Sequence, residues 1–413
     1  MMIKNLFYQK LNNSKSNSSS NDFLKYQAQT SPFPLMVDVK KAKGSYIYDK
    51  SGKKYLDFVA GVSACSVGHC NKKVINAINK QAKKYLHVMV YGEFITDSAL
   101  ELAKIISKNI PTELTTTYFT NSGTEAIEAS IKLARRYTGK KKIIGAEKAY
   151  HGSTLGSLTL MGMKEKKKPF EPLIPMVDFI KYNSVKDISK IDSNTACVVL
   201  ETIQGSAGFI KPKDDYLNRV KKQCLKVGAL LILDEIQTGI GRTGKLFGFQ
   251  NFACVPDIIV YGKGLGGGVP IGAFTTTKEK MDVLHKNPTL GHITTFGGNP
   301  LVTAAALQTI KIILNSNLME KSLEYENIFR NSLRHKLIQE IRGMGLMLCL
   351  ILKNSEIANS LVLQAKERGL ILFWLLIEKK AVRITPPLTI SRKEISLGCK
   401  IIISILNSIE SDC

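Results

Sequence analysis

Unbroken apolar runs alternate with amphipathic segments through the middle of the chain. The runs 229–233 and 258–261 contain no charged residue, which is typical of strands buried in a parallel sheet. Residues 216–227 carry apolar side chains at helical spacing and are followed by Gly228, so they predict a crossover helix. Strands that alternate with helices predict a large α/β domain over residues 77–315.

The pattern changes toward both ends of the chain. Residues 1–22 include a polar stretch rich in serine and asparagine, which predicts a disordered N-terminal segment. Residues 23–76 contain a hairpin-like pattern and predict the N-terminal part of a small domain. Residues 316–413 predict the C-terminal part of that domain. Within it, the apolar run 343–352 is too short to cross a membrane and predicts one core strand.

A lysine set among glycines follows the second apolar run. Gly262-Lys263-Gly264-Leu265-Gly266-Gly267-Gly268 places Lys263 at the end of a predicted strand, with small neighbours that leave space around its amine. A lysine drawn partly out of water has a lowered pKa and becomes nucleophilic, which suits Schiff-base chemistry with an aldehyde cofactor. A solvated lysine in a flexible loop is the alternative interpretation.

An acidic residue follows the first apolar run in the same way. Asp234 comes directly after residues 229–233. Because the carboxyl ends of parallel strands meet at one edge of a sheet, we expect Asp234 and Lys263 to share a crevice. A pyridoxal phosphate site needs a carboxylate at the ring nitrogen and a lysine for the aldehyde. Taken alone, Asp234 would more simply be a helix cap or a surface acid.

A third motif has the features of a phosphate site. Residues 121–126 (Asn-Ser-Gly-Thr-Glu-Ala) precede an amphipathic helical pattern that stops at Gly139. The free N–H groups at the start of such a helix bind anions, and Ser122 and Thr124 add hydroxyl donors. Ordinary N-capping explains either hydroxyl equally well, so only the combination of motifs discriminates.

As a set, these motifs resemble those of the class III aminotransferases of the acetylornithine and ornithine type. The resemblance covers the chain from about Phe23 to about Leu406. It implies the type I pyridoxal phosphate-dependent transferase fold, an α/β fold with a large, mostly parallel sheet domain and a smaller α+β domain. The segments that carry it are 55–58, 68–69, 121–126, 150–152, 201–205, 233–237, 262–268, 294–300 and 383–388.

The resemblance implies pyridoxal 5'-phosphate as cofactor and gives residues their roles. Lys263 binds the cofactor aldehyde and shuttles the proton, and Asp234 pairs with the ring nitrogen. Gln237 reaches the ring hydroxyl, and Tyr150 stacks on the ring. The cofactor-binding residues that it implies are Lys263, Asp234, Gln237, Ser122, Gly123, Thr124, Tyr150, His151 and Thr295.

The same resemblance implies a homodimer and a substrate site. Thr295 reaches the phosphate of the neighbouring subunit, so that each site is complete only in the dimer. Arg383 binds the substrate carboxylate, for which a planar two-pronged donor is suited. Glu201 neutralises Arg383 in one half-reaction and releases it in the other, so that one pocket takes an ω-amino donor and 2-oxoglutarate.

The implied reaction is transfer of an amino group from acetylornithine or a similar ω-amino donor to 2-oxoglutarate, in arginine or related amino-acid biosynthesis. Two departures leave the donor open. Ser153 stands where many members have arginine, and residues 206–208 read Ser-Ala-Gly where many have Glu-Gly-Gly. The alternatives are an ornithine, succinyl-diaminopimelate, 4-aminobutyrate or diaminopelargonate aminotransferase, or an aminomutase of the same fold.

Composition and the remaining motifs bear on other classes of protein. The net charge of +24 could indicate nucleic-acid binding, but the lysines are spread along the chain without a nucleic-acid motif, so we expect no such partner. Residues 239–245 nearly match a P-loop, but Leu246 stands at the position that requires Ser or Thr. The sequence contains no HExxH or CxxC motif, so it gives no indication of a metal site. Eight cysteines without framework spacing and no signal peptide or membrane span predict a cytoplasmic protein.

Overall fold

The computed structural model describes residues 18–411. Helix α2 (Ser18–Tyr26) begins inside the segment expected to be disordered, so that prediction is wrong for residues 18–22. Nζ of Lys50 donates to Oγ of Ser19 at 3.1 Å, which joins the start of this helix to the turn that follows strand β2 (Tyr46–Asp49). Residues 1–17, the rest of the predicted disordered segment, lie outside the described residues.

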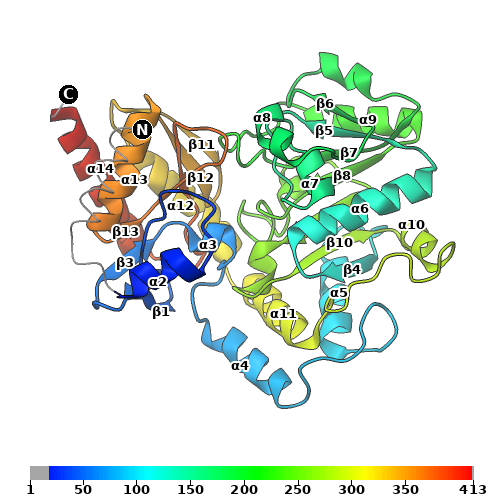
Figure 1. The fold of residues 1–413 in the computed structure, drawn as a ribbon, viewed down its shortest axis with the longest axis horizontal. Helices are drawn as coiled ribbons and strands as arrows, with labels where there is room; N and C mark the ends of the chain where they lie inside the picture. The colour runs from blue at the N-terminus through cyan, green and yellow to red at the C-terminus, as the bar shows by residue number, and fades with distance from the viewer. Residues whose placement is uncertain (1–17, 412–413) are drawn as a thin grey trace.

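A seven-stranded sheet forms the larger lobe, on the right of Figure 1. Its neighbouring strands from β9 through β8, β7 and β5 to β6 are parallel, whereas β10 runs antiparallel to both β9 and β4. The predicted α/β fold with a large, mostly parallel sheet is therefore confirmed. In spatial order the strands are β4 (Thr116–Thr120), β10 (Gly272–Thr276), β9 (Ile258–Gly262), β8 (Leu230–Asp234), β7 (Thr195–Glu201), β5 (Lys142–Ala146) and β6 (Val177–Ile180).

Alternate residues of these strands pack on opposite faces of the sheet, as the pleat requires. Ile232 and Val260 pack in one cluster with Ile127 of α6 (Gly123–Thr138). Leu231 and Leu233 belong to the cluster on the other face. That face is covered by helices α9 (Tyr216–Val227), α5 (Asp97–Lys108) and α11 (Pro300–Leu314). The predicted crossover helix is thus confirmed as α9, which ends at Gly228 in the left-handed conformation.

Both ends of the chain build the smaller lobe, where blue and orange to red elements lie side by side in Figure 1. The predicted hairpin is β2–β3, and the C-terminal strand β13 pairs in parallel with β3. One four-stranded sheet has the order β1 (Val39–Lys43), β2 (Tyr46–Asp49), β3 (Lys54–Asp57) and β13 (Leu370–Ile371). The other has the order β11 (Ile338–Met344), β12 (Met347–Leu352), β15 (Ala381–Ile384) and β14 (Phe373–Trp374).

The remaining elements are short or cover these sheets, and the domain boundaries given above stay a prediction. Helices α12 (Leu318–Ser332), α13 (Ser355–Glu367) and α14 (Arg392–Ser411) belong to the C-terminal part. The shorter α-helices are α3 (Ala60–Ser63), α4 (Lys72–Ala82), α7 (Leu155–Thr159), α8 (Lys164–Lys167) and α10 (Lys278–Asp282). The 3-10 helices span Lys168–Phe170, Lys186–Lys190, Gly248–Asn251, Lys263–Gly266 and Val283–His285.

The single core strand predicted over residues 343–352 is wrong, because the chain turns back on itself there. Strand β11 ends at Met344, β12 begins at Met347, and the two pair antiparallel. Gly343 and Gly345 have φ of +108° and +59°, which favour glycine. A Cβ on Gly343 would lie 1.9 Å from the carbonyl oxygen of Met347, so this hairpin needs glycine at that position.

No single helix within residues 18–411 is long and apolar enough to cross a membrane. Helices α11 and α12 pass such a test only together, and they meet at a bend of 67°. Helix α11 packs against α4 and α5.

Candidate active site

Lys263 follows β9 and begins a short 3-10 helix over residues 263–266. Its φ of +41° is uncommon for a residue with a side chain, and such backbone strain concentrates at functional sites. The side chain is partly buried, and no ion pair or hydrogen bond joins its amine to another described residue. Burial lowers the pKa of Lys263, and Arg383 lowers it further, against the opposing effect of Asp234 and Glu201.

Asp234 is the last residue of β8, the strand beside β9. Its Oδ2 lies 2.7 Å from Nδ1 of His151, and its Oδ1 accepts the backbone N–H of Ile236 at 2.9 Å. Burial opposes protonation of His151, but the hydrogen bond to Asp234 and the charges of Asp234 and Glu201 together outweigh burial and raise the pKa of His151. Nε2 of His151 is buried and has no hydrogen-bond partner in the part of the chain that the structure describes. The expected proximity of Asp234 and Lys263 is reflected in their electrostatic interaction.

The start of α6 reaches the same edge of the sheet. Ser122 caps the helix, because its Oγ accepts the backbone N–H of Glu125 at 3.3 Å. A Cβ on Gly123 would lie 2.6 Å from Cδ1 of Ile236, just after the end of β8. Gly262 is the last residue of β9, and a Cβ on it would lie 3.7 Å from Cα of Gly123. The free N–H groups of this 16-residue helix therefore begin beside Asp234 and Lys263.

Thr124 packs against the loop that follows the Tyr-His-Gly motif. Its Oγ1 lies 2.8 Å from Oγ1 of Thr154 and donates to Oγ of Ser157 at 2.9 Å. A Cβ on Gly152 would lie 2.2 Å from Oγ1 of Thr124, so glycine is required for this close approach. The sequence gave no signal for Thr154 and Ser157. Their contacts with Thr124 arise only because the loop that carries them packs over the start of α6.

Glu201 ends β7, one strand further along the sheet. Its Oε1 accepts the backbone N–H of Gly205 at 2.9 Å, and its Oε2 accepts that of Tyr150 at 3.3 Å. Burial raises the pKa of Glu201 to about 7. A Cβ on Gly205 would lie 2.9 Å from Oε1 of Gln237 and 3.1 Å from Oε1 of Glu201. These side chains therefore meet around Gly205, and the hydroxyl of Tyr150 lies 3.3 Å from that of Ser153.

Arg383 comes from β15 of the smaller lobe. Its Nε donates to the carbonyl oxygen of Trp374 at 3.3 Å, whereas its buried Nη1 has no hydrogen-bond partner among the described residues. Burial lowers the pKa of Arg383 to about 10, and its charge in turn lowers the pKa of Lys263. The expected ion pair with Glu201 is not among the interactions of residues 18–411, since Glu201 is bonded to Gly205 and Tyr150 instead.

A left-handed turn that the sequence did not predict packs beside Gln237 and Gly264. The four residues of α3, Ala60–Ser63, all have φ between +51° and +67°. Nε2 of Gln237 lies 3.4 Å from Oγ of Ser63. A Cβ on Gly264 would lie 2.3 Å from Oγ of Ser66, so the turn packs tightly on the glycine after Lys263. Gly61 is the one residue of a type that favours positive φ here, whereas alanine, valine and serine at the other three positions give no signal for it.

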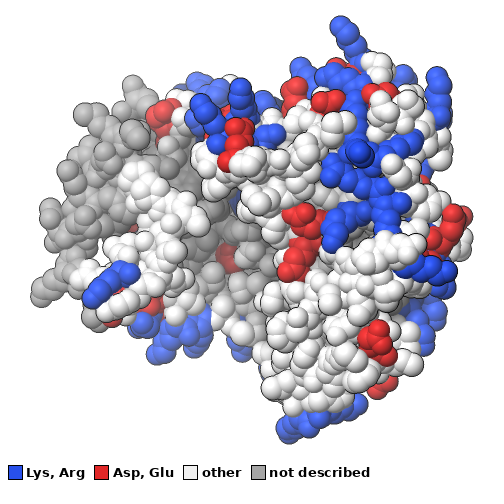
Figure 2. Space-filling view, turned by 45° about the vertical axis from the view of Figure 1, so that its right-hand side comes forward, with Lys and Arg blue, Asp and Glu red and all other residues white. Residues whose placement is uncertain are grey.

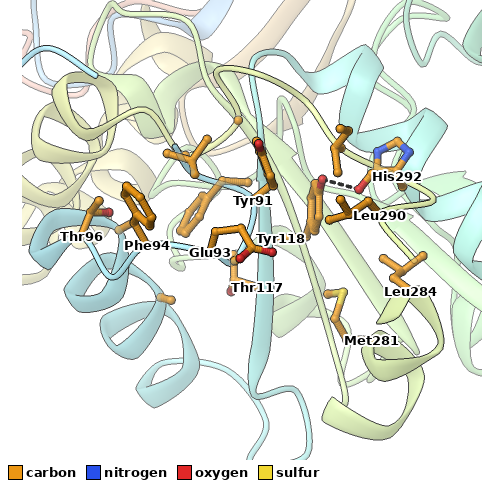
Figure 3. A pocket seen from close by; sticks show the side chains of 18 of the residues that line it. Tyr91, Glu93, Phe94, Thr96, Thr117, Tyr118, Met281, Leu284, Leu290 and His292 are labelled. Atoms are coloured by element: carbon orange, nitrogen blue, oxygen red, sulfur yellow. Dashed lines mark hydrogen bonds between the residues drawn. The ribbon is translucent and has the colours of Figure 1, made fainter. Parts of the chain in front are cut away.

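Thr295 lies in the segment that precedes α11 and has an exposed side chain. The nearby segments 90–103 and 289–298 line a cavity of about 530 Å³ that contains none of the predicted site residues. Figure 3 shows Tyr91, Phe94 and Tyr118 among the side chains gathered around it. The hydroxyl of Tyr118 donates to the backbone carbonyl of His292 at 2.8 Å, which fixes one wall.

Comparison with known proteins agrees with this geometry. The family model described as Aminotransferase class-III matches residues 26–406. An acetylornithine aminotransferase of Clostridium acetobutylicum is 38% identical over 375 residues, which are 87% of this chain and 93% of that protein. A putrescine aminotransferase of Pectobacterium atrosepticum is 38% identical over 87% of this chain and 80% of that protein. The solved ornithine aminotransferase of Toxoplasma gondii ME49 has a TM-score of 0.89 at 30% identity and covers 99% of both chains.

The fold and the site define a pyridoxal phosphate-dependent transaminase. The chain belongs to the class III aminotransferases. Family membership confirms the resemblance, the class of enzyme and the type I fold. It also assigns pyridoxal 5'-phosphate as the cofactor, with an amino donor and an amino acceptor as substrates.

Proposed function

We propose that this aminotransferase moves an amino group from acetylornithine or a similar ω-amino donor to 2-oxoglutarate, in arginine or related amino-acid biosynthesis. Relatives with the name acetylornithine aminotransferase, 37–39% identical over about nine-tenths of the chain, support this donor. The observation that carries the chemistry is the partly buried Lys263, which lies at the same sheet edge as Asp234 and whose amine has no ion-pair partner among residues 18–411. A cytoplasmic location is part of the proposal.

Three features of the site suit pyridoxal phosphate. The start of α6 offers unpaired backbone N–H groups and the positive end of its dipole, and Ser122, Gly123 and Thr124 would hold the phosphate there. Asp234 would hold the ring nitrogen, and Gln237 the ring hydroxyl. Tyr150 would cover the ring. Beside Asp234, the buried Nε2 of His151 has no hydrogen-bond partner among the described residues, so it is free to bond to a bound group.

When bound, pyridoxal phosphate supplies an electron sink for the negative charge that develops on the substrate carbon next to nitrogen. Lys263 would hold the cofactor through its amine and then, once displaced by the donor, move a proton at that carbon. Its lowered pKa favours the neutral amine that both tasks require. Asp234 would keep a positive charge on the ring nitrogen, and His151 would keep Asp234 in place through the 2.7 Å contact.

Arg383 would bind a substrate carboxylate. Its buried Nη1 has no hydrogen-bond partner within residues 18–411, and an unsatisfied buried guanidinium is costly until it binds an anion. Figure 2 shows Lys and Arg side chains gathered over part of one face, with Asp and Glu among them. The net charge of +24 would also attract anionic dicarboxylates toward the enzyme.

We further propose a homodimer in which Thr295 reaches the phosphate of the neighbouring site. Large apolar side chains are exposed on the segments beside Thr295, which is typical of an interaction surface. Ile95 is 86% exposed, and the others are Phe94, Leu290, Ile293 and Phe296.

A panel of amino donors tests the proposed function. Each donor is mixed with the purified enzyme without an acceptor, and the change in visible cofactor absorbance gives the rate of the first half-reaction. We expect acetylornithine to react fastest, compared with ornithine, succinyl-diaminopimelate, 4-aminobutyrate, diaminopelargonate and putrescine. A faster reaction of any other donor would replace acetylornithine in the proposal. No absorbance change with any of them would reject the ω-amino donor class.

A further inference from the structure

Asp57 and His69 form an ion pair in the smaller lobe. Asp57 is buried and ends β3, and its Oδ2 lies 2.7 Å from Nε2 of His69. The hydrogen bonds of His69 to Asp57 and to Cys65 outweigh burial and raise the pKa of His69 to about 10, so its imidazole is charged near neutral pH. The backbone N–H and carbonyl groups of His69 both bond to Gly44, at 2.8 Å and 2.9 Å, which anchors His69 to the turn between β1 and β2.

The other oxygen of Asp57 holds the start of the left-handed turn Ala60–Ser63. Oδ1 of Asp57 accepts the backbone N–H groups of Val59 at 2.7 Å and of Ala60 at 3.0 Å. Three of the four residues in the turn are not glycine, and positive φ strains such residues, so neighbouring groups must hold the turn in place. Because one oxygen of Asp57 binds the turn and the other binds His69, the ion pair fixes the position from which the carboxylate holds the turn.

The turn and the residues after it contact the candidate active site in the larger lobe. Nε2 of Gln237 donates to Oγ of Ser63 at 3.4 Å. A Cβ on Gly264 would clash with Oγ of Ser66 and would lie 3.3 Å from the carbonyl oxygen of Ser63, so this part of the chain packs directly on the glycine that follows Lys263. A displacement of the turn would therefore reach both Gln237 and Lys263.

Thr385, directly after β15, holds the chain just before the turn by uncharged bonds. Its backbone N–H donates to the carbonyl oxygen of Phe58 at 2.8 Å, and its Oγ1 donates to that of Val59 at 3.1 Å. These two bonds do not depend on the ion pair. We therefore expect loss of the Asp57–His69 pair to loosen the turn without unfolding the lobe.

We propose that Asp57 and His69 are positioning residues, which orient the transaminase site through the left-handed turn. The side chains that they orient are Gln237 and, through Gly264, Lys263. This inference rests on the proposed function for the roles of those two side chains. Because other contacts hold Asp234 and the start of α6, we expect loss of the ion pair to lower turnover more than cofactor affinity.

His69→Gln tests the proposal, because glutamine keeps a polar side chain but has no charge. In the cofactor-loaded enzyme, hydrogen exchange of the backbone N–H groups of residues 59–66 should be about tenfold faster or more. With the donor that reacts fastest, kcat should fall about tenfold or more, since small displacements of reacting groups are costly. KM for that donor and the Kd of pyridoxal phosphate should stay within about threefold of the wild type. A folded variant with an unchanged kcat would overturn the proposal.

His335→Gln is the matched control. Nε2 of His335 lies 3.2 Å from Oε2 of Glu410, which makes a second pair of histidine and carboxylate in the smaller lobe. We expect its loss to change neither the exchange of residues 59–66 nor kcat by more than about twofold. Equal losses of kcat in the two variants would mean that the whole lobe is weakened, and would overturn the positioning role.

Lys263→Ala separates this inference from the proposed function. Retained turnover in Lys263→Ala would reject the proposed role of Lys263 and the positioning role with it. Loss of turnover there, together with an unchanged kcat in His69→Gln, would reject only the positioning role.

Asp57→Asn covers the case in which His69→Gln does not fold. Asparagine keeps an oxygen for the backbone N–H groups of Val59 and Ala60 but removes the charge that faces His69. The same fall in kcat at a nearly constant Kd of pyridoxal phosphate is expected. An unchanged kcat in Asp57→Asn would overturn the proposal.

Discussion

Oδ2 of Asp234 lies 2.7 Å from Nδ1 of His151, and both side chains are buried at the end of β8. The second oxygen of Asp234 accepts the backbone N–H of Ile236. The carboxylate is thus held from two sides in a fixed direction. A carboxylate held rigidly at the carboxyl end of a parallel strand can pair with the ring nitrogen of the cofactor and keep it protonated.

Asp234→Ala should therefore lose most of the aminotransferase activity and retain the cofactor poorly, because the ring nitrogen is no longer held protonated. Turnover and the visible absorbance that remains after gel filtration measure the two effects. Asp215→Ala, which breaks an exposed pair with Arg219, is the matched control and should change neither. Ordinary rates in Asp234→Ala would mean that this carboxylate has another role.

Gly123→Ala should weaken cofactor binding and destabilise the protein. The new Cβ would lie 2.6 Å from Cδ1 of Ile236, and such overpacking typically costs about 1–3 kcal/mol. Thermal unfolding and the Kd of pyridoxal phosphate measure the effects. Gly139→Asn at the other end of α6 is the control, because it meets open space and asparagine tolerates the left-handed conformation there. Equal effects of the two substitutions would argue against a phosphate site at Gly123.

Glu201→Gln should change the pH dependence of stability. The folded-state pKa of Glu201 is about 7, above its ordinary value of 4.5, so the stability that this group contributes is fully present below pH 4.5 and is lost as the pH rises through 7. Glutamine does not titrate, so the variant does not lose stability in this way as the pH rises. Relative to the wild type, the variant should therefore gain on the order of 3 kcal/mol in the free energy of unfolding between about pH 4 and pH 8.

Urea unfolding at both pH values measures this difference. Glu101→Gln, at an exposed pair with Lys104, is the control and should show no comparable gain. A gap between Glu201→Gln and the wild type that does not change with pH would mean that folding does not raise the pKa of Glu201.

Ile95→Asp should convert the proposed homodimer to a monomer. The side chain of Ile95 is 86% exposed on the apolar surface beside Thr295, and an aspartate buried there on association would lack a partner. Sedimentation measures the mass, and turnover should fall with it, because Thr295 would no longer reach the second site. Leu225→Asp, on the exposed side of helix α9, is the control and should remain dimeric. A monomeric wild type would reject this part of the proposal.

Most elements that carry the site could be predicted because local patterns determine them. Strands β8 and β9 are apolar throughout, and α6 has a capping serine before it and Gly139 after it. The β11–β12 hairpin was missed because its glycines, Gly343 and Gly345, sit inside an apolar run that looks continuous.

Contacts between distant segments could not be predicted in the same way. The partner of Glu201 depends on the turn at Gly205 and on the loop of Tyr150, which pack together only in the folded chain. The left-handed turn at Ala60–Ser63 packs against Gly264, and only Gly61 among its four residues is of a type that favours positive φ. The helix that starts at Ser18 likewise has a tertiary contact, to Lys50, that a polar composition does not reveal.

Covalent capture of the cofactor by borohydride tests the central claim most directly. Reduction of the enzyme loaded with pyridoxal phosphate fixes the bond between the cofactor and its lysine, and mass spectrometry of a digest then locates it. We predict a single modified peptide with the label on Lys263, and no label and no turnover in Lys263→Ala, since loss of the proton shuttle alone costs roughly 10²- to 10⁴-fold. A label on another lysine of the wild type, or none, would contradict the account.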